Sequence, residues 1–224
     1  MGFWQLLGET VILGIAAAFT PSLLAMQVLV VCGDPWRRRA LAVAVGAASA
    51  FVIVGALLFF GFAQLPKDPL GDSTLGAWLR IAGGLVLLVF AVVLFRPHPG
   101  LRQRVAADIR GYVAHASSWV FLGVAFALSI KDLSSFVVMA PILHDVAVAD
   151  INVIEQAVLL AVLYALALSP VLAPPCARLL FGHRADRAMH GIYVFTMGHQ
   201  FQLVGGMAAV MAAFLLITGI ARLV

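Results

Sequence analysis

The chain has 224 residues, of which 63% are hydrophobic and only 11% charged, and its formal net charge is +4. Soluble domains carry roughly 25% charged residues, and one of this size would expose a large apolar surface with such a composition. Together with a mean hydropathy of +1.08, this excludes an ordinary soluble domain and predicts an integral membrane protein. The basic excess lies in short arginine clusters between apolar runs, which is typical of juxtamembrane anchoring and argues against nucleic-acid binding.

Six apolar runs are each long enough to cross a bilayer, which takes about 20 helical residues. They are Thr10–Cys32, Arg39–Phe62, Leu75–Phe95, Trp119–Ile142, Val153–Leu172 and Met197–Ala221. The sixth has a lead-in from about Ala188 that we expect to be amphipathic or bent. Pro170 and the Pro174-Pro175 pair are expected to stop or bend the fifth. The predicted fold is therefore an all-α membrane protein with six transmembrane helices.

The positive charges follow the connections between these runs. The first, third and fifth connections are rich in arginine, whereas the second and fourth are mainly acidic. The basic residues are Arg37, Arg38, Arg39, Arg96, Arg102, Arg104, Arg110, Arg178, Arg184 and Arg187 against Lys67, and the fourth connection holds His144, Asp145 and Asp150. The positive-inside rule then predicts a multi-pass protein of the cell inner (plasma) membrane, with loops 1, 3 and 5 cytoplasmic and both termini outside.

The two halves of the chain look alike. Residues 1–95 and 119–224 each contain a helix with a polar interruption, an apolar helix, and a helix with a Gly-Gly pair. Because three helices is an odd number, two such copies would lie in opposite orientations, as in inverted-repeat transporters. The connection at 96–118 is predicted to be cytoplasmic, and its stretch Leu101–His115 is read either as a short amphipathic helix or as a basic tether.

The polar interruptions fall at matching positions, Phe19–Ser22 in the first helix and Ser129–Ser135 in the fourth. A break frees backbone groups that cannot face lipid, so interrupted helices mark a binding site near the midplane. A single proline, however, often only kinks a membrane helix. The glycine pairs have two readings as well, as hinges or as close-packing surfaces. They are Gly83, Gly84, Gly205 and Gly206.

Lys131 and Asp132 are the strongest functional signal. A charge near the centre of a membrane helix costs roughly 2.5–3.5 kcal/mol on insertion scales. Two interpretations remain open: a buried pair that locks the bundle, or a polar cavity wall that binds an anionic group, a proton, or both. Ser129 would lie beside them on the same wall.

The first helix would supply the opposing wall. Thr20 and Ser22 can bond the freed carbonyls or contact substrate, and Pro21 removes one backbone donor. Gln27, about two turns further on, is predicted either to join helices or to bind cargo.

Nothing in the sequence suggests catalysis. It holds no hydrolytic motif, no phosphate-binding glycine loop and no metal-ligand spacing, so we expect neither an enzyme nor a cofactor or metal site. Cys32 and Cys176 lie at predicted helix ends and define neither a disulfide scaffold nor a zinc site.

Two segments resemble a known family. The first is Ala16–Gly61, with Phe19-Thr20-Pro21-Ser22 followed by Asp34-Pro35-Trp36-Arg37-Arg38-Arg39-Ala40-Leu41. It resembles the start of the lysine-exporter (LysE) superfamily, and within it the glycolipid-addressing protein (GAP or Sap-like) branch. Gly123–Leu133 resembles that branch's fourth-helix motif, except that Ser129-Ile130 stands where the branch has Asn-Pro. The resemblance covers nearly the whole chain and implies a three-plus-three arrangement and an export role.

The function expected from residues and resemblance together is a secondary transporter that moves a cell-envelope lipid, glycolipid or anionic amphiphile through a midplane cavity between helices one and four. One alternative is an exporter of amino acids or other small solutes, and another is a non-transporting scaffold of a larger envelope export complex. The expected partners are membrane lipids and a lipid or small-molecule substrate. The surfaces rich in Gly and Ala are compatible with a homodimer.

Overall fold

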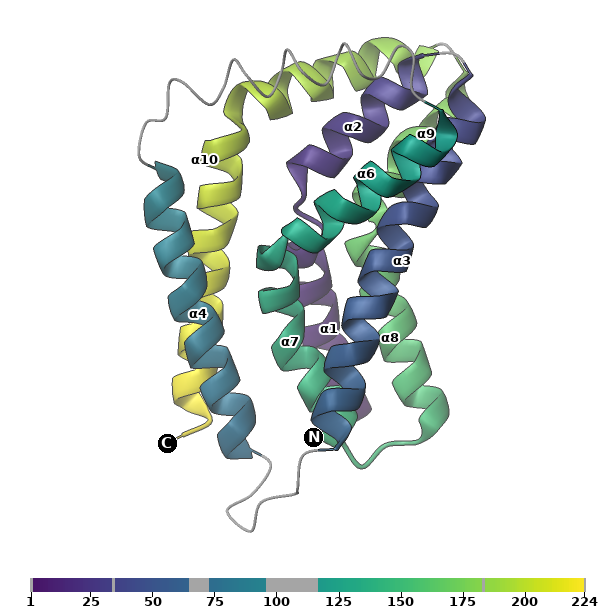
Figure 1. Cartoon of the computed structure of the whole chain (residues 1–224). Coiled ribbons are helices and arrows are strands. Elements are labelled where there is room, and N and C mark those ends of the chain that lie inside the picture. The colour runs from purple at the N-terminus through teal and green to yellow at the C-terminus, as the bar shows by residue number, and fades with distance from the viewer. Residues whose placement is uncertain (1, 34, 65–72, 96–116, 183, 224) are drawn as a thin grey trace.

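The computed structural model describes residues 2–33, 35–64, 73–95, 117–182 and 184–223, and these residues are helical apart from short turns (Figure 1). The connection 96–118 therefore lies almost wholly outside the described residues, as do Asp34 and Lys67. The helices are α1 (Phe3–Ala17), α2 (Pro21–Cys32), α3 (Trp36–Ala63), α4 (Ser73–Phe95), α6 (Ser118–Lys131), α7 (Leu133–Val148), α8 (Val153–Ala167), α9 (Ser169–Phe181) and α10 (Arg184–Ala221).

Three helical segments of the described chain are each long and apolar enough to cross a membrane: Trp36–Ala63, Thr74–Phe95 and Phe201–Ala221. The other helices form three bent pairs, each of which would also count as one span. The bends are 65° between α1 and α2, and 68° both between α6 and α7 and between α8 and α9. The structure thus has three to six candidate spans, in agreement with a polytopic membrane protein.

Two of the predicted spans differ from the structure. The fourth was expected to end at Ile142, but α7 continues to Val148. His144 and Asp145, expected in a loop, are consequently helical and buried. The fifth bends at Leu168, directly before Pro170, as expected, but it does not stop at Leu172: α9 continues through Pro174 and Pro175 to Phe181.

The bends also limit the likeness of the two halves. α3 is one continuous helix of 28 residues, whereas its counterpart in the second half is the bent pair α8–α9. The interruptions in the first and fourth spans do occur at matching places, as the sequence predicts. The inverted relation of the halves stays a prediction.

α10 begins with the bent lead-in expected from the sequence. Its backbone leaves helical geometry at His199, with φ −120° and ψ 15°. Before this point the helix runs across one end of the molecule, and after it the helix turns to run along the bundle (Figure 1). The polar lead-in thus ends just before the apolar segment Phe201–Ala221 begins.

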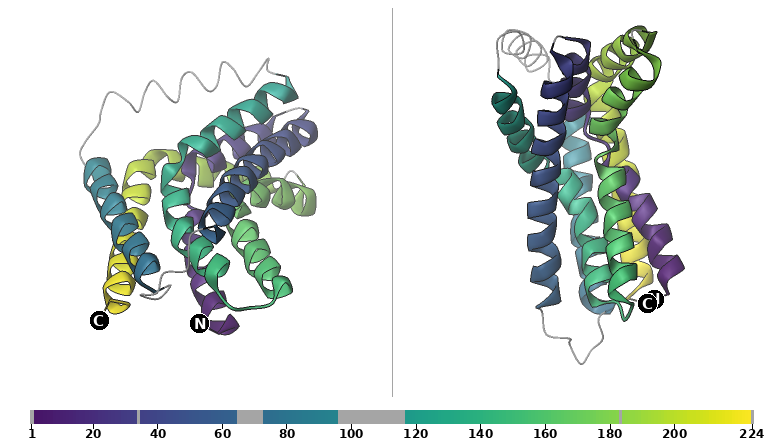
Figure 2. Two further views of the ribbon diagram at one scale, coloured as in Figure 1. Left: turned by 60° about the horizontal axis from the view of Figure 1, so that its bottom comes forward. Right: turned by 90° about the vertical axis from the view of Figure 1, so that its right-hand side faces the viewer.

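α4 and the second part of α10 lie side by side along one edge of the bundle (Figure 2). Glycines let them approach closely: a Cβ on Gly84 would lie 2.8 Å from Leu216 Cγ, and one on Gly219 would lie 2.8 Å from Ile81 Cγ1. α1 and α7 pack against each other beside this pair. Both chain termini lie at the end opposite to the α10 lead-in (Figure 1).

Candidate functional site

The first break separates α1 from α2 at Ala18, Phe19 and Thr20. α1 ends at Ala17, and the Ala18 N–H donates to the carbonyl oxygens of Gly14 and Ala16. α2 begins at Pro21, which lies in its first turn. Proline is favoured there because a first-turn N–H has no helical partner to lose. Thr20 precedes α2 but its side chain does not cap the helix; its hydroxyl instead reaches the Ala18 carbonyl at 3.4 Å.

The second break is centred on Asp132, whose ψ of 67° takes the chain out of helical geometry between α6 and α7. The carboxylate of Asp132 accepts hydrogen bonds from the hydroxyls of Ser134 and Ser135, the latter at 2.7 Å. A carboxylate at the start of a helix also complements the positive end of the helix dipole. Asp132 is therefore held by its own helix start, and it does not pair with Lys131.

The two breaks are in contact. Ser135 Oγ lies 2.9 Å from the carbonyl oxygen of Ala17, at the end of α1, and shares its one hydrogen between this oxygen and Asp132 Oδ2. Both breaks lie about midway between the two ends of the molecule (Figure 1). The expectation that the first and fourth spans face each other through their interruptions is thus confirmed.

A cavity of about 360 Å³ lies against both breaks. Its walls come from the α1–α2 break, from α4, from the α6–α7 break and from α10 just beyond its bend. The lining residues are Phe19, Thr20, Pro21, Ser22, Phe90, Leu94, Leu128, Lys131, Asp132, Ser134, Phe201 and Val204. Five of the predicted binding residues, namely Thr20, Pro21, Ser22, Lys131 and Asp132, are therefore brought together here.

Lys131 is the last residue of α6 and is exposed toward this cavity. Within the part of the chain that the structure describes, its ammonium has no hydrogen-bond or ion-pair partner. A cation at a helix C-terminus is favoured by the helix dipole, but only by about 0.3–1 kcal/mol. That is less than the cost of placing a charge at membrane depth, so the dipole alone does not account for Lys131.

Two predicted residues lie elsewhere. Gln27 is fully buried and its amide donates to the Ala40 carbonyl at 3.2 Å, so it joins α2 to α3. Ser129 is also buried, and its hydroxyl bonds the carbonyl of Ala125 in its own helix. Neither lines the cavity, because each points from its helix into the packed interior.

A second cavity of about 200 Å³ lies on the other side of the α1–α2 break. It is almost entirely apolar, with walls from the break, from α9 and from the bend region of α10. It is lined by Ala18, Phe19, Thr20, Pro21, Leu24, Pro170, Phe195, Thr196 and Leu203. Phe19, Thr20 and Pro21 line both cavities, so the break is the wall between a partly charged space and an apolar one.

The glycine pairs differ in their surroundings. Gly84 packs tightly against α10, and Gly83 faces Val137 of α7. Gly205 lies against Leu94 and Phe95 of α4, whereas a Cβ on Gly206 would meet nothing within 4 Å. Three of the four thus lie at close helix contacts, which supports the packing reading over the hinge reading.

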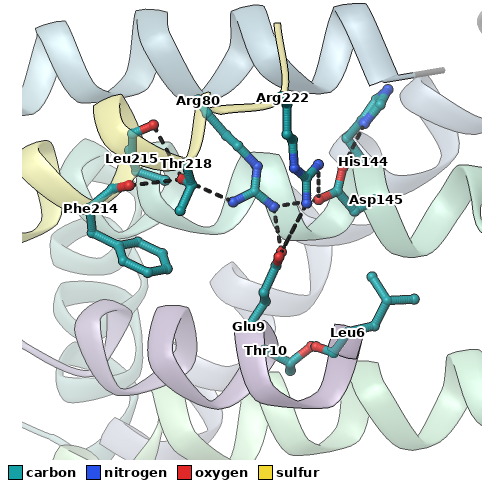
Figure 3. A network of polar contacts seen from close by, with 10 residues as sticks. All are labelled: Leu6, Glu9, Thr10, Arg80, His144, Asp145, Phe214, Leu215, Thr218 and Arg222. Atoms are coloured by element: carbon teal, nitrogen blue, oxygen red, sulfur yellow. Dashed lines mark hydrogen bonds and ion pairs between the residues drawn. The ribbon is translucent and has the colours of Figure 1, made fainter. Parts of the chain in front are cut away.

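The sequence analysis missed a group of buried charges near the termini, which we call the ion-pair cluster: Glu9, Arg80, His144, Asp145 and Arg222 (Figure 3). Arg80 is fully buried and donates to both Glu9 and Asp145. Arg222 donates to Asp145 at 2.9 Å and to Glu9 at 3.2 Å. The missed signal was Arg80 itself, a charged residue inside an apolar run.

No group of three or more His, Cys, Asp or Glu side chains that could hold a metal occurs in the described residues. Cys32 and Cys176 are both exposed.

These features define a polytopic α-helical membrane protein whose broken helices line a cavity, and the described walls of this cavity carry Lys131 and Asp132 among mostly apolar residues. Residues 10–221 match the family described as Sap, sulfolipid-1-addressing protein, and the chain belongs to this family. The match indicates a role in sulfolipid or glycolipid addressing or export, in agreement with the Sap-like resemblance in the sequence. No curated protein and no solved structure matches the chain significantly.

Proposed function

We propose that this chain translocates an anionic amphiphile of the glycolipid class across the cell inner membrane, through the cavity at the two breaks. The observation that carries the proposal is the cavity of about 360 Å³ that places the Lys131 ammonium among aromatic and aliphatic side chains. The family description, which names a sulfolipid, supports the same class of cargo.

The polar part of the cavity suits an anionic head group. Lys131 supplies a positive charge and Ser22 a hydroxyl beside it, whereas the hydroxyls of Thr20 and Ser134 already donate to the Ala18 carbonyl and to Asp132. α2 and α7 both begin at the cavity, and the positive end of a helix dipole attracts anions. This is the arrangement of discontinuous membrane helices whose half-helix starts point at an anionic substrate group.

The remaining walls suit an aliphatic chain better than a small hydrophilic solute. Phe19, Phe90, Leu94, Leu128 and Phe201 contribute apolar surface on the same cavity. Burying apolar surface releases about 25 cal/mol per Å², so these walls favour an amphiphile over an amino acid. The adjacent apolar cavity behind Pro21 extends that surface.

The orientation in the membrane follows from charge. Arg37 and Arg38 begin α3, Arg178 lies near the end of α9, and Arg184 and Arg187 begin α10. These helix ends meet at one end of the molecule, opposite to the termini (Figure 1). By the positive-inside rule this end is cytoplasmic, and its arginines attract anionic lipids at about 1 kcal/mol each.

Reconstitution tests the proposal. The full-length protein is placed in liposomes containing a sulfated glycolipid with a fluorescent acyl chain, and movement between leaflets is followed by quenching of the outer leaflet with dithionite. Lys131→Gln should slow movement roughly tenfold or more, because a charge-assisted contact contributes about 1.5–3 kcal/mol. The control is Asp150→Asn, which removes a charge from an exposed residue after α7 that lines neither cavity and should leave the rate nearly unchanged.

Two outcomes would contradict the proposal. Rapid movement of a radiolabelled amino acid with no movement of the glycolipid would favour the small-solute exporter. Absence of transport by folded wild-type protein, with Lys131→Gln lowering only its stability, would favour the scaffold within a larger envelope complex.

A further inference from the structure

The ion-pair cluster joins two pairs of helices, α4 with α10 and α1 with α7, near the end of the molecule where the termini lie. Arg80 lies in α4 and Arg222 directly follows the end of α10 at Ala221, whereas Glu9 and Asp145 belong to α1 and α7. All four ion pairs between these side chains therefore cross from the α4–α10 pair to the α1–α7 pair. The other polar bond of Arg80, from Nη1 to Thr218 Oγ1 at 3.3 Å, stays within the α4–α10 pair.

The cluster and the cavity lie at different positions along the bundle, the cluster near the chain termini and the cavity toward the middle. From Arg80 to Phe90 on α4, ten residues correspond to about 15 Å of helix, and Glu9 lies about 12 Å of helix before the end of α1 at Ala17. Phe90 and Phe19 line the cavity. The helix pairs are thus joined by the cluster near the termini, also pack through Gly83 and Val137, and border the cavity toward the middle.

The cluster is too costly to be explained as a stabilising device alone. Arg80 is fully buried and its Nε has no hydrogen-bond partner among the described residues, so even the closed arrangement leaves one polar group unpaired. Buried ion pairs often contribute no more stability than apolar residues of similar size. An all-apolar contact at this end would hold the pairs together at lower cost.

Charged and apolar contacts differ in how water solvates their groups after separation. Separated apolar surfaces remain unfavourable in water, whereas separated carboxylates and guanidinium groups are hydrated. A contact made of ion pairs can therefore exist in a closed, paired state and in an open, hydrated state. The local balance of two acidic and two basic side chains keeps the closed state neutral when His144 is uncharged.

We propose that the ion-pair cluster is the gate on the side of the membrane opposite to the arginine-rich end, and that this structure shows it closed. Opening would separate α4 and α10 from α1 and α7, with Arg80 and Arg222 leaving Glu9 and Asp145. His144 would remain beside Asp145, because both belong to α7. Its Nδ1 lies 3.3 Å from Asp145 Oδ1, and its ring packs against Phe62 of α3. This inference rests on the proposed function, since a gate requires cargo.

Distance measurements between the two helix pairs test the gate directly. Spin labels are attached to cysteines introduced by Trp4→Cys in α1 and Trp78→Cys in α4, two exposed positions near the cluster, after Cys32 and Cys176 are replaced by serine. The distance between the two labels is measured in lipid nanodiscs by double electron–electron resonance. The variant Glu9→Gln/Asp145→Asn removes both negative charges with little change of shape, leaving two cations that repel each other.

The double variant should shift the distance distribution toward longer values. The matched control is Thr218→Val, which removes a bond to Arg80 within the α4–α10 pair and should leave the distribution as in the wild type. If the double variant does not fold, Glu9→Gln alone serves, because Glu9 is partly exposed, at 17%, and its replacement disturbs the interior less. An unchanged distribution in folded variants would overturn the gate.

The failure of the gate can be told apart from the failure of transport. Wild-type glycolipid movement together with unchanged distances would refute the gate and leave the proposed function standing. If the wild-type protein moves no glycolipid, the proposed function fails whatever the labels report. A second label pair, at Phe95→Cys and Ile130→Cys beside the cavity, should report shorter distances when the gate opens.

Discussion

Ser135 Oγ lies 2.9 Å from the carbonyl oxygen of Ala17 and 2.7 Å from Asp132 Oδ2, so one hydroxyl connects the two interrupted spans. The residues are far apart in the chain, and the contact exists because α1 ends where α7 begins. It fixes the position of one cavity wall relative to the other.

Ser135→Ala should therefore loosen the site. The variant loses the bond to Ala17 and one of the two hydroxyls on Asp132, and we expect a loss of about 1 kcal/mol in the free energy of unfolding. Unfolding in mixed detergent micelles measures it. Ser134→Ala is the control, since it removes a hydroxyl from Asp132 without touching α1. An equal loss in both variants would contradict a special role for the link to Ala17.

Asp132→Asn should strengthen binding of anionic cargo. Ser134 and Ser135 donate to different oxygens of Asp132, so the substitution keeps an acceptor for only one of the two hydroxyls, and it removes a negative charge from the cavity wall that also carries Lys131. We expect roughly a fivefold gain in affinity, equivalent to about 1 kcal/mol. Titration of the protein in nanodiscs with a sulfated glycolipid checks this. A gain of equal size for an uncharged glycolipid would show that electrostatics is not the cause.

Arg80→Met should be among the most destabilising single substitutions in the chain. It leaves Glu9 and Asp145 buried with only Arg222 to compensate them, and breaking a buried ion pair costs about 3–5 kcal/mol. Adding Asp145→Asn should recover part of the loss, because one negative charge then faces one positive charge. Thermal unfolding monitored by circular dichroism compares the variants. No recovery in the double variant would mean that packing of Arg80, and not charge balance, determines its contribution.

Gly84→Ala should separate α4 from α10. A Cβ at this position would lie 2.8 Å from Leu216 Cγ and 3.1 Å from the Ala212 carbonyl oxygen, so the helices must move apart. Overpacking of this kind costs about 1–3 kcal/mol. Gly206→Ala is the matched control, because its new methyl group meets nothing within 4 Å and alanine is the better helix former. Equal stability of the two variants would contradict the packing reading of Gly84.

Gln27→Met should leave cargo binding unchanged. Gln27 joins α2 to α3 through the Ala40 carbonyl, and its own Oε1 is buried without a partner among the described residues. Loss of one hydrogen bond is offset by loss of an unsatisfied acceptor, so stability should change by less than about 1 kcal/mol. The glycolipid titration and unfolding are measured on the same preparation. A clear drop in affinity would place Gln27 in the binding site after all.

The interruptions were predictable because their signals are local. Proline at residue 21 and the polar run from Ser129 to Ser135 stand out inside apolar segments, and a bilayer tolerates such residues only where backbone groups find partners. The bend at Leu168 was also signalled by the prolines after it. The sequence did not show that α7 continues past His144 and Asp145, because polar residues near a predicted span end look like a loop.

Apolar runs of bilayer length and their polar breaks determined, from the sequence alone, that this is a helical membrane protein with interrupted spans, since lipid constrains each segment separately. Only the tertiary structure decided which polar side chains share a space. Lys131 meets Ser22 at the cavity while Gln27 turns away from it, and Arg80 finds Glu9 and Asp145 across 71 and 65 residues of chain. Such pairings depend on how helices rotate and pack against one another, which no single segment specifies.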